Sequence, residues 1–329
     1  MERTSKIIMK INEKAIVYIC PRCQTKLDIR QKVEKKFACF QCKKDFISDQ
    51  NYIDFITNSK LDEFSIQALE TWGKDLHREG IENVSHFANM KKRIGPELNL
   101  ISGNVAEIGF GTGTDLERIA SMKKIDHLIG IDIGENAYYL AKKLSRFTNI
   151  SVIRADAQSL PLADEQFDFI YSYGVIHHTK NPLKAFKECR RILKKHGLIY
   201  LYVYSNHSQN FIKKLGIICE RLIMEILILL PRKLRILFCI IITPMVWIAF
   251  TLPARIIRRI GMVKTSQTIP FYWGKGPFSI LPDIKDRFLA PVNHRFSKKS
   301  LHKMLEQANI ESIKSIEDST GIYIQGKAK

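Results

Sequence analysis

The sequence contains no internal repeat, no low-complexity tract and no recognisable targeting signal. Charged residues interrupt positions 1–19 throughout, which excludes the continuous apolar segment of a secretory signal peptide. Because no export signal precedes them, the cysteines are expected to stay reduced in a cytoplasmic protein. The length of 329 residues indicates two domains, or one domain with additions, and allows a sizeable core.

Acidic residues are in short supply: 33 Asp and Glu face 52 Lys and Arg, which gives a formal charge of +19. Such a protein is expected to favour polyanions or anionic membranes, and the charge alone does not choose between them. The chain also lacks a recognisable RNA-binding module.

A third glycine is missing from the place where a dinucleotide-binding loop needs one. The stretch AEIGFGTGTD resembles a strand end followed by Gly109, Gly111 and Gly113, but the G-x-G-x-x-G fingerprint requires glycine at Thr114. A carboxylate at Glu107 would also repel a pyrophosphate. Bare backbone beside a carboxylate better fits a ligand that carries an ammonium group and a ribose.

Downstream, short apolar runs alternate with helical patterns. HLIGID ends in Asp132, nineteen residues after Gly113, where a carboxylate can accept hydrogen bonds from both ribose hydroxyls. ISVIRADA contains Asp156, and FDFIYSYGVIHH runs into His177 and His178. Strands that alternate with helices predict an α/β fold, a Rossmann-like doubly wound parallel sheet.

Signals at chain ends and turns support this layout. Asn181 can cap a helix that begins at Pro182 and that Gly197 is expected to close, before the strand LIYLYVYS. A capped helix and two short strands around Ser319–Gly321 are expected near the C-terminus. Residues 58–98 are expected to be helical and give no chemical clue.

The ordered motifs between residues 99 and 205 resemble those of class I S-adenosylmethionine-dependent methyltransferases, of the methyltransferase type 11 kind. The resemblance implies a seven-stranded sheet that is completed by a closing antiparallel pair. By this resemblance the chain would hold the methionine end of the cofactor (Glu107, Gly109, Gly111, Gly113), its ribose (Asp132) and its adenine (Asp156, Ala157), with two residues near the reacting methyl group (Ser172, Tyr173).

The first fifty residues contain a separate signal. Cys20 and Cys23, followed after fifteen residues by Cys39 and Cys42, have the spacing of a four-thiolate structural Zn²⁺ site. A disulfide pair is the competing interpretation. The segment also resembles the small zinc ribbons of the Trm112 type, which often precede methyltransferase domains as structural or docking modules. The other cysteines are expected only to pack in apolar surroundings (Cys189, Cys219, Cys239).

We therefore expect a zinc ribbon at 1–57, a methyltransferase domain at 58–205 and 282–329, and an apolar helical insertion at 206–281. Within the insertion, Ile236–Ala254 has nineteen residues without a charge, which is long enough to cross a membrane. A single crossing is disfavoured because the chain must return to the same sheet, and a double crossing would put the basic PRKLR turn on the wrong side.

Two interpretations of the insertion stay open. In one, residues 211–264 lie in the membrane interface; in the other, the insertion is a buried lid or an oligomer interface. The first is favoured by basic residues suited to anionic headgroups (Arg232, Lys233, Arg235, Arg255, Arg258, Arg259, Lys264). The location would then be the cytoplasm, with peripheral contact at the inner face of the membrane.

The acceptor side of the site is less well defined. His177 or His178 could be a general base, or both could cap or pack; Tyr272 and His294 are weaker candidates for acceptor contacts. The favoured function is methyl transfer to an amphiphilic or lipid-linked small molecule.

Two other functions remain open. The first is an RNA methyltransferase that uses the zinc ribbon and the basic surface, although SYGVIHH stands where amine-methylating nucleic-acid enzymes have an N-P-P-[YF] tetrad. The aromatic residues of IPFYWGKGPF could stack on bases or line a lipid or sugar pocket. The second is an inactive cofactor-binding partner module, which the intact cofactor motifs weaken.

Overall fold

The computed structural model describes residues 16–29, 35–57, 86–94, 101–207 and 210–329. The expectation of helix at 58–98 falls mostly outside these residues; within them, α2 (His86–Ile94) is helical.

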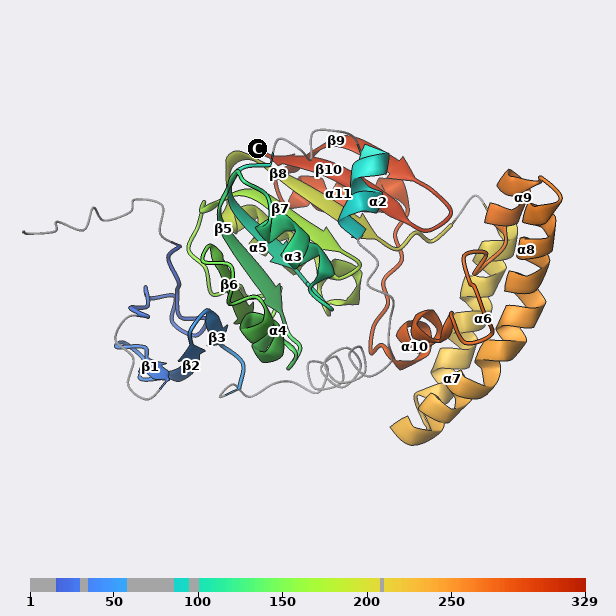
Figure 1. Ribbon diagram of the computed structural model, residues 1–329, viewed down its shortest axis with the longest axis horizontal. Helices are drawn as coiled ribbons and strands as arrows, with labels where there is room; N and C mark the ends of the chain where they lie inside the picture. Colours follow the sequence, from blue (N-terminus) through green and yellow to red (C-terminus); the bar gives the residue numbers. More distant parts are fainter. Residues whose placement is uncertain (1–15, 30–34, 58–85, 95–100, 208–209) are drawn as a thin grey trace, which may run out of the picture.

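A doubly wound sheet forms the centre of the molecule (Figure 1). Its order is β6-β5-β4-β7-β8-β10-β9, with β10 antiparallel to both neighbours and the other pairs parallel. The seven strands are β4 (Gly103–Ile108), β5 (Ile125–Asp132), β6 (Ile150–Arg154), β7 (Phe167–Tyr173), β8 (Leu193–Val203), β9 (Ile310–Glu317) and β10 (Ile322–Ala328). The expected Rossmann-like fold with a closing antiparallel pair is confirmed.

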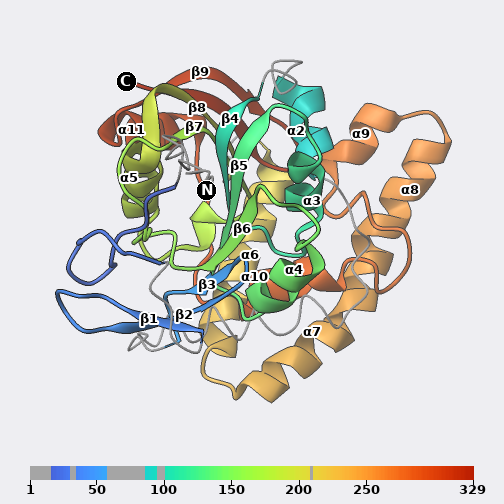
Figure 2. The same cartoon turned by 60° about the vertical axis from the view of Figure 1, so that its left-hand side comes forward.

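Helices cover both faces of the sheet (Figures 1 and 2). On one face α5 (Pro182–Ile192) and α11 (Lys298–Gln307) share a core with Ala106 and Ile108 of β4. On the other face α2, α3 (Thr114–Ala120) and α4 (Ala137–Lys143) pack with Val105. Alternate side chains of β4 thus enter opposite cores, as a strand buried on both faces requires.

The start of α5 agrees with the sequence, but its end does not. The side chain of Asn181 accepts a hydrogen bond from the Lys184 N–H at 3.1 Å. The helix stops at Ile192, not at Gly197, because Leu193 already pairs with Phe167 of β7 and is fully buried. Gly197 lies within β8.

The cysteine-containing module adds three strands to the same sheet. They are β1 (Lys36–Ala38), β2 (Asp45–Asp49) and β3 (Tyr52–Asp54), and β3 pairs with β6 in parallel. Phe37 and Phe46 join the same buried cluster as Ile108. At the junction, the buried carboxylate of Asp54 lies 3.3 Å from the Arg154 guanidinium.

A helical subdomain stands beside the sheet, on the right in Figure 1. It consists of α6 (Phe211–Leu227), α7 (Arg232–Val246), η4 (Trp247–Thr251), α8 (Leu252–Arg259), α9 (Val263–Thr268) and α10 (Leu281–Leu289). Its own core includes Cys239, Phe271 and Phe288. Within the described ranges, Arg232–Arg259 is the one helix that is long and apolar enough to cross a membrane, judged by length and composition alone.

Replacing Arg154 by Leu should lower the apparent urea midpoint of unfolding strongly, by the equivalent of about 3–5 kcal/mol, because the Asp54 carboxylate would stay buried without its cation. Arg146→Leu is the matched control: its partner Glu117 is in an exposed pair, and the expected loss is below about 1 kcal/mol. Equal losses in the two variants would show that the junction pair has no special role.

Candidate active site

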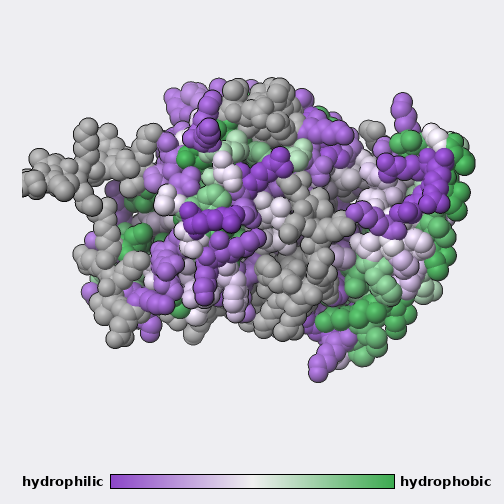
Figure 3. Space-filling model, in the orientation of Figure 1, coloured by the Kyte–Doolittle hydropathy of each residue, from purple (hydrophilic) through white to green (hydrophobic). Residues whose placement is uncertain are grey.

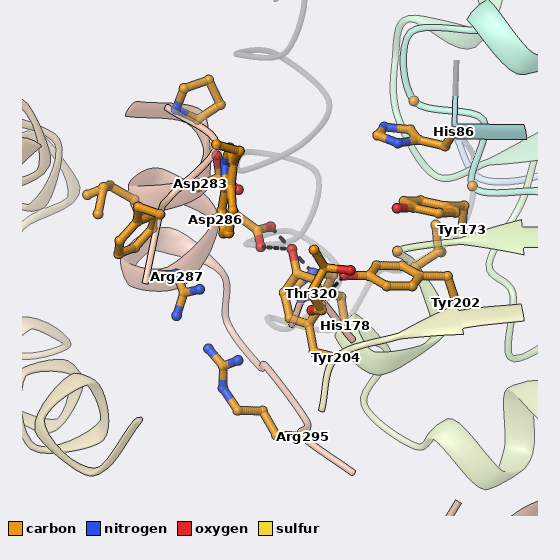
Figure 4. A pocket seen from close by; sticks show the side chains of 18 of the residues that line it. His86, Tyr173, His178, Tyr202, Tyr204, Asp283, Asp286, Arg287, Arg295 and Thr320 are labelled. Atoms are coloured by element: carbon orange, nitrogen blue, oxygen red, sulfur yellow. Dashed lines mark hydrogen bonds and ion pairs between the residues drawn. The ribbon is translucent and has the colours of Figure 1, made fainter. Parts of the chain in front are cut away.

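A cavity of about 1480 Å³ opens where the carboxyl ends of the parallel strands meet the helical subdomain (Figure 4). Sites for one small molecule usually occupy about 300–1,000 Å³, so this cavity has room for a cofactor and a second ligand. Residues of the glycine loop line one end, and residues of α6, α7 and α10 line the other.

The glycines of the loop have different tasks. Gly109 has a φ of 76°, and a Cβ atom there would come within 2.0 Å of the Val175 side chain. Gly111 also has a positive φ, of 51°, but nothing lies within 4 Å of its Cβ position, and it lines the cavity. Gly113 packs against Leu140 and is not among the lining residues. The loop therefore presents bare backbone to a ligand mainly at Gly111.

Glu107 ends β4 at the wall of the cavity and is almost fully buried. Burial raises the pKa of its carboxyl group well above the usual value, and the negative charges of Asp115 and Asp132 raise it further. No described protein group donates a hydrogen bond to its Oε2 atom. A buried acceptor in an acidic setting is suited to a cationic group, and the ammonium of S-adenosylmethionine fits this requirement.

Two further carboxylates line the same end of the cavity. Asp132 accepts hydrogen bonds from the N–H groups of Gly111 at 3.0 Å and Gly134 at 2.8 Å, and these fix its orientation. Asp156 accepts the Gln158 N–H at 2.8 Å, and Ala157 is its neighbour in the lining. Both positions are compatible with the predicted ribose and adenine contacts.

Of the two residues predicted near the methyl group, only one lines the cavity. Ser172 is buried, is not a lining residue, and donates a hydrogen bond to the Ile108 carbonyl at 3.0 Å. Tyr173 does line the cavity, and its ring lies between those of His86 and Tyr202 with centroid distances of 4.2 Å to each.

Of the two adjacent histidines, too, only one lines the cavity. His177 is fully buried and does not line the cavity, and burial lowers its pKa well below the usual value. His178 does line it: Nδ1 lies 3.1 Å from the Val292 carbonyl oxygen, and Nε2 lies 3.4 Å from Oδ1 of Asp286. Both ring nitrogens of His178 thus face oxygen acceptors.

The weaker acceptor-side candidates lie behind the wall. His294 donates its backbone N–H to the His177 carbonyl at 2.9 Å, and the Tyr272 hydroxyl accepts a hydrogen bond from Ser319 at 3.2 Å. Neither is among the residues that line the cavity, although Phe271 and Trp273 are.

The polar residues that α10 and α6 contribute to the cavity were not predicted from the sequence. Asp286 accepts a hydrogen bond from the Tyr204 hydroxyl at 3.0 Å (Figure 4). Glu220 of α6 forms ion pairs with Arg287 at 2.5 Å and Arg295 at 2.6 Å. Burial also raises the pKa of Asp283 to about 6. These residues form no motif along the chain, so only packing reveals them.

The four cysteines of the N-terminal module meet at one point. Their sulfur atoms lie within 4.8 Å of one another, with Cys20 and Cys42 at 3.6 Å and Cys23 and Cys39 at 3.5 Å. Zn–S bonds of about 2.3 Å in a tetrahedron place sulfurs about 3.8 Å apart. The cluster is therefore compatible with Zn²⁺, and all seven cysteines of the chain are free of disulfides.

The strand order, the glycine loop and the carboxylates at Glu107 and Asp132 are those expected of a class I S-adenosylmethionine-dependent methyltransferase domain. In agreement, residues 106–201 match the family model described as a methyltransferase domain.

Relatives carry several different names. An uncharacterized chloroplast methyltransferase of Arabidopsis thaliana is 23% identical, covering 60% of this chain and 64% of that protein. Demethylmenaquinone methyltransferase of Staphylococcus saprophyticus is 30% identical over 36% of this chain and 54% of its own length. tRNA U34 carboxymethyltransferase of Campylobacter concisus is 31% identical over 33% and 38%. The chain thus spans less than two thirds of each of these curated relatives.

The affinity for S-adenosylhomocysteine, a stable ligand with the same ammonium group and ribose, should rise as the pH increases above the ordinary titration range of a glutamic acid side chain. In the free protein the raised pKa keeps Glu107 protonated to higher pH, and binding of an ammonium favours the ionised form, so binding releases a proton.

Calorimetry in buffers of different ionisation enthalpy would measure that proton release. Glu107→Gln should remove the pH dependence, whereas Asp132→Ala should weaken binding at every pH. A pH dependence that persists in Glu107→Gln would rule out the assignment of Glu107.

Replacing Cys20 and Cys23 by Ser should release about one equivalent of Zn²⁺ per chain, since the site would keep two of its four thiolates. Cys219→Ser, at an exposed position outside the cluster, is the control and should retain the metal. Metal content measured by mass spectrometry that stayed the same in both variants would contradict the four-cysteine site.

Proposed function

We propose that the protein transfers a methyl group from S-adenosylmethionine to an amphiphilic or lipid-linked small-molecule acceptor. The main support for this proposal is that one continuous cavity extends from the glycine loop to the helices of the helical subdomain. Acceptors of this kind are found at membranes, and the corresponding location is the cytoplasm at the inner face of the membrane.

The lining of the cavity changes along its length. Near the glycine loop it is polar, with Glu107, Asp132 and Asp156. Toward the helical subdomain it combines charged residues, among them Glu220, Asp286 and Arg287, with apolar ones: Ile223, Ile242, Val246, Phe250, Phe271 and Phe288. An acceptor with a polar reacting end and an apolar body matches this combination.

When bound, S-adenosylmethionine supplies an electrophilic methyl group on its sulfonium. The chain's own task is to hold the acceptor in line with that group and to remove a proton where the attacking atom carries one. We assign the proton to the Asp286 carboxylate, which faces the cavity and is oriented by Tyr204 and His178. His178 is then a positioning residue, and His177, which does not reach the cavity, has no direct part.

RNA is the second candidate acceptor. The tRNA-modifying relative and the formal charge of +19 favour it. An inactive cofactor-binding partner module would bind the cofactor through the same residues, so a transfer assay and not cofactor binding separates it from an enzyme.

With S-adenosylmethionine labelled in the methyl group, label should enter the organic phase of a total lipid extract and not total tRNA. Asp286→Asn keeps the shape of the side chain but removes the base, and should reduce transfer by about 10²–10⁴-fold without changing cofactor affinity. Asp164→Asn, at an exposed carboxylate in a surface ion pair, is the matched control. Label in tRNA alone would replace this proposal with the RNA alternative.

A further inference from the structure

The continuous helix formed by α7, η4 and α8 exposes large apolar side chains along one face. The side chains it buries against the rest of the protein include small and partly polar residues: Cys239, Thr243, Thr251 and Ala254, each at most 1% exposed. The opposite face carries large apolar side chains that are 36–62% exposed: Leu234, Leu237, Ile241, Met245, Ile248, Leu252 and Ile256.

These exposed residues recur every three or four positions, so they form one stripe along the helix. The stripe extends from Leu234 to Ile256 within the helix Arg232–Arg259, a length of about 33 Å at 1.5 Å per residue. Figure 3 shows apolar colour along the outer side of the molecule, where Figure 1 places α7 and α8. Only 17% of the most apolar eighteen-residue window of this helix is buried. A surface of this size marks an interaction site.

We propose that this stripe is the surface by which the protein docks on an anionic lipid bilayer, with the helix lying in the plane of the interface. Charge supports a lipid partner. Between Glu225 and Asp283 the sequence has eight basic residues and no acidic one. Lys233 lies near one end of the stripe, and Arg258 and Arg259 lie near the other, all exposed. The arrangement allows apolar side chains to enter the acyl region while the basic groups reach headgroups.

The inner face of the helix excludes a crossing of the bilayer. Along that face Thr251 donates its hydroxyl hydrogen bond to the Phe271 carbonyl at 2.9 Å, and Arg255 donates to the Gly274 carbonyl at 3.1 Å. Farther along, α10 packs on α7, with Phe238 and Phe288 in ring contact at 5.5 Å. The helix is thus attached to folded polypeptide along one side, while the stripe on its other side stays exposed.

A second copy of the chain fits the stripe less well. Two stripes facing each other, parallel or antiparallel, would bring the basic ends of one helix against the basic ends of the other, with no acidic residue of this segment to offset the repulsion.

The inner side of the same helix lines the cavity at Ile242 and Val246. A bilayer on the stripe would therefore lie about one helix diameter, roughly 10 Å, from the acceptor end of the cavity. The docking surface would deepen the proposed function, but lipid binding itself does not depend on which acceptor is methylated.

The test is co-sedimentation of the full-length, zinc-containing protein with phosphatidylcholine vesicles, with and without phosphatidylglycerol. Ile241→Glu combined with Met245→Glu should reduce the partition coefficient at least about tenfold on the anionic vesicles. Tyr139→Glu combined with Ile313→Glu introduces the same charges at exposed apolar positions outside the helical subdomain, and should change it less than about twofold. Arg258→Gln combined with Arg259→Gln should weaken binding only when phosphatidylglycerol is present.

Retained binding of S-adenosylhomocysteine shows that each variant is folded, and makes failure here distinguishable from failure of the proposed activity. Absence of wild-type binding to both kinds of vesicle would overturn the proposal, as would equal binding by the stripe variant and its control. Formation of a dimer that the stripe variant abolishes, measured by light scattering without vesicles, would reassign the stripe to a second copy of the chain.

Discussion

The β-bridge between Ser205 and Phe296 constrains everything on the acceptor side of this molecule. Ser205 follows β8 and Phe296 precedes α11, so the helical subdomain between them leaves and returns at the same edge of the sheet, where the parallel strands have their carboxyl ends. That edge lies beside the cavity, and the intervening chain folds over it. The helical subdomain is therefore held at both ends above the reacting position, and its α10 can bring Asp286 to Tyr204 without any local sequence signal.

A second constraint comes from placing acidic groups together under the glycine loop. Asp115 is satisfied by the Phe87 N–H and the Tyr171 hydroxyl, both at 3.0 Å, and Asp132 by two backbone N–H groups. No described protein group donates a hydrogen bond to Oε2 of Glu107, and the negative charges of Asp115 and Asp132 raise the pKa of its carboxyl group. Selectivity for a cationic nucleoside over a phosphate-bearing one follows from this imbalance, since a phosphate would meet three carboxylates.

Local chemistry explains what could be predicted from the sequence. The glycine loop, the three carboxylates near strand ends and the four cysteines each depend on residues within a short segment. The structure places the carboxylates and the loop, except Gly113, at the cavity and the cysteines in one cluster. Features that depend on tertiary packing could not be predicted from the sequence. His177 and His178 are adjacent, yet the short 3₁₀ turn at Ile176–His178 buries one and turns the other toward Asp286. Glycine is common at helix ends, so Gly197 was expected to end α5, but Leu193 already pairs with β7 and the helix ends earlier. The roles of Asp286 as base and of His178 as positioning residue are proposals.

The two additions to the sheet act on opposite ends of the cofactor site. The cysteine module extends the edge at β6, and Arg154, which pairs with Asp54 of that module, stands two residues before Asp156. The helical subdomain instead follows the carboxyl end of β8, beside the other half of the cavity. Ligation of Zn²⁺ by the four cysteines would stabilise a module too small for a sufficient core of its own, and would thereby stiffen the end of the cavity that Asp156 lines. The acceptor side is built from helices whose large apolar residues face outward, and its stability is therefore coupled to whatever covers that face.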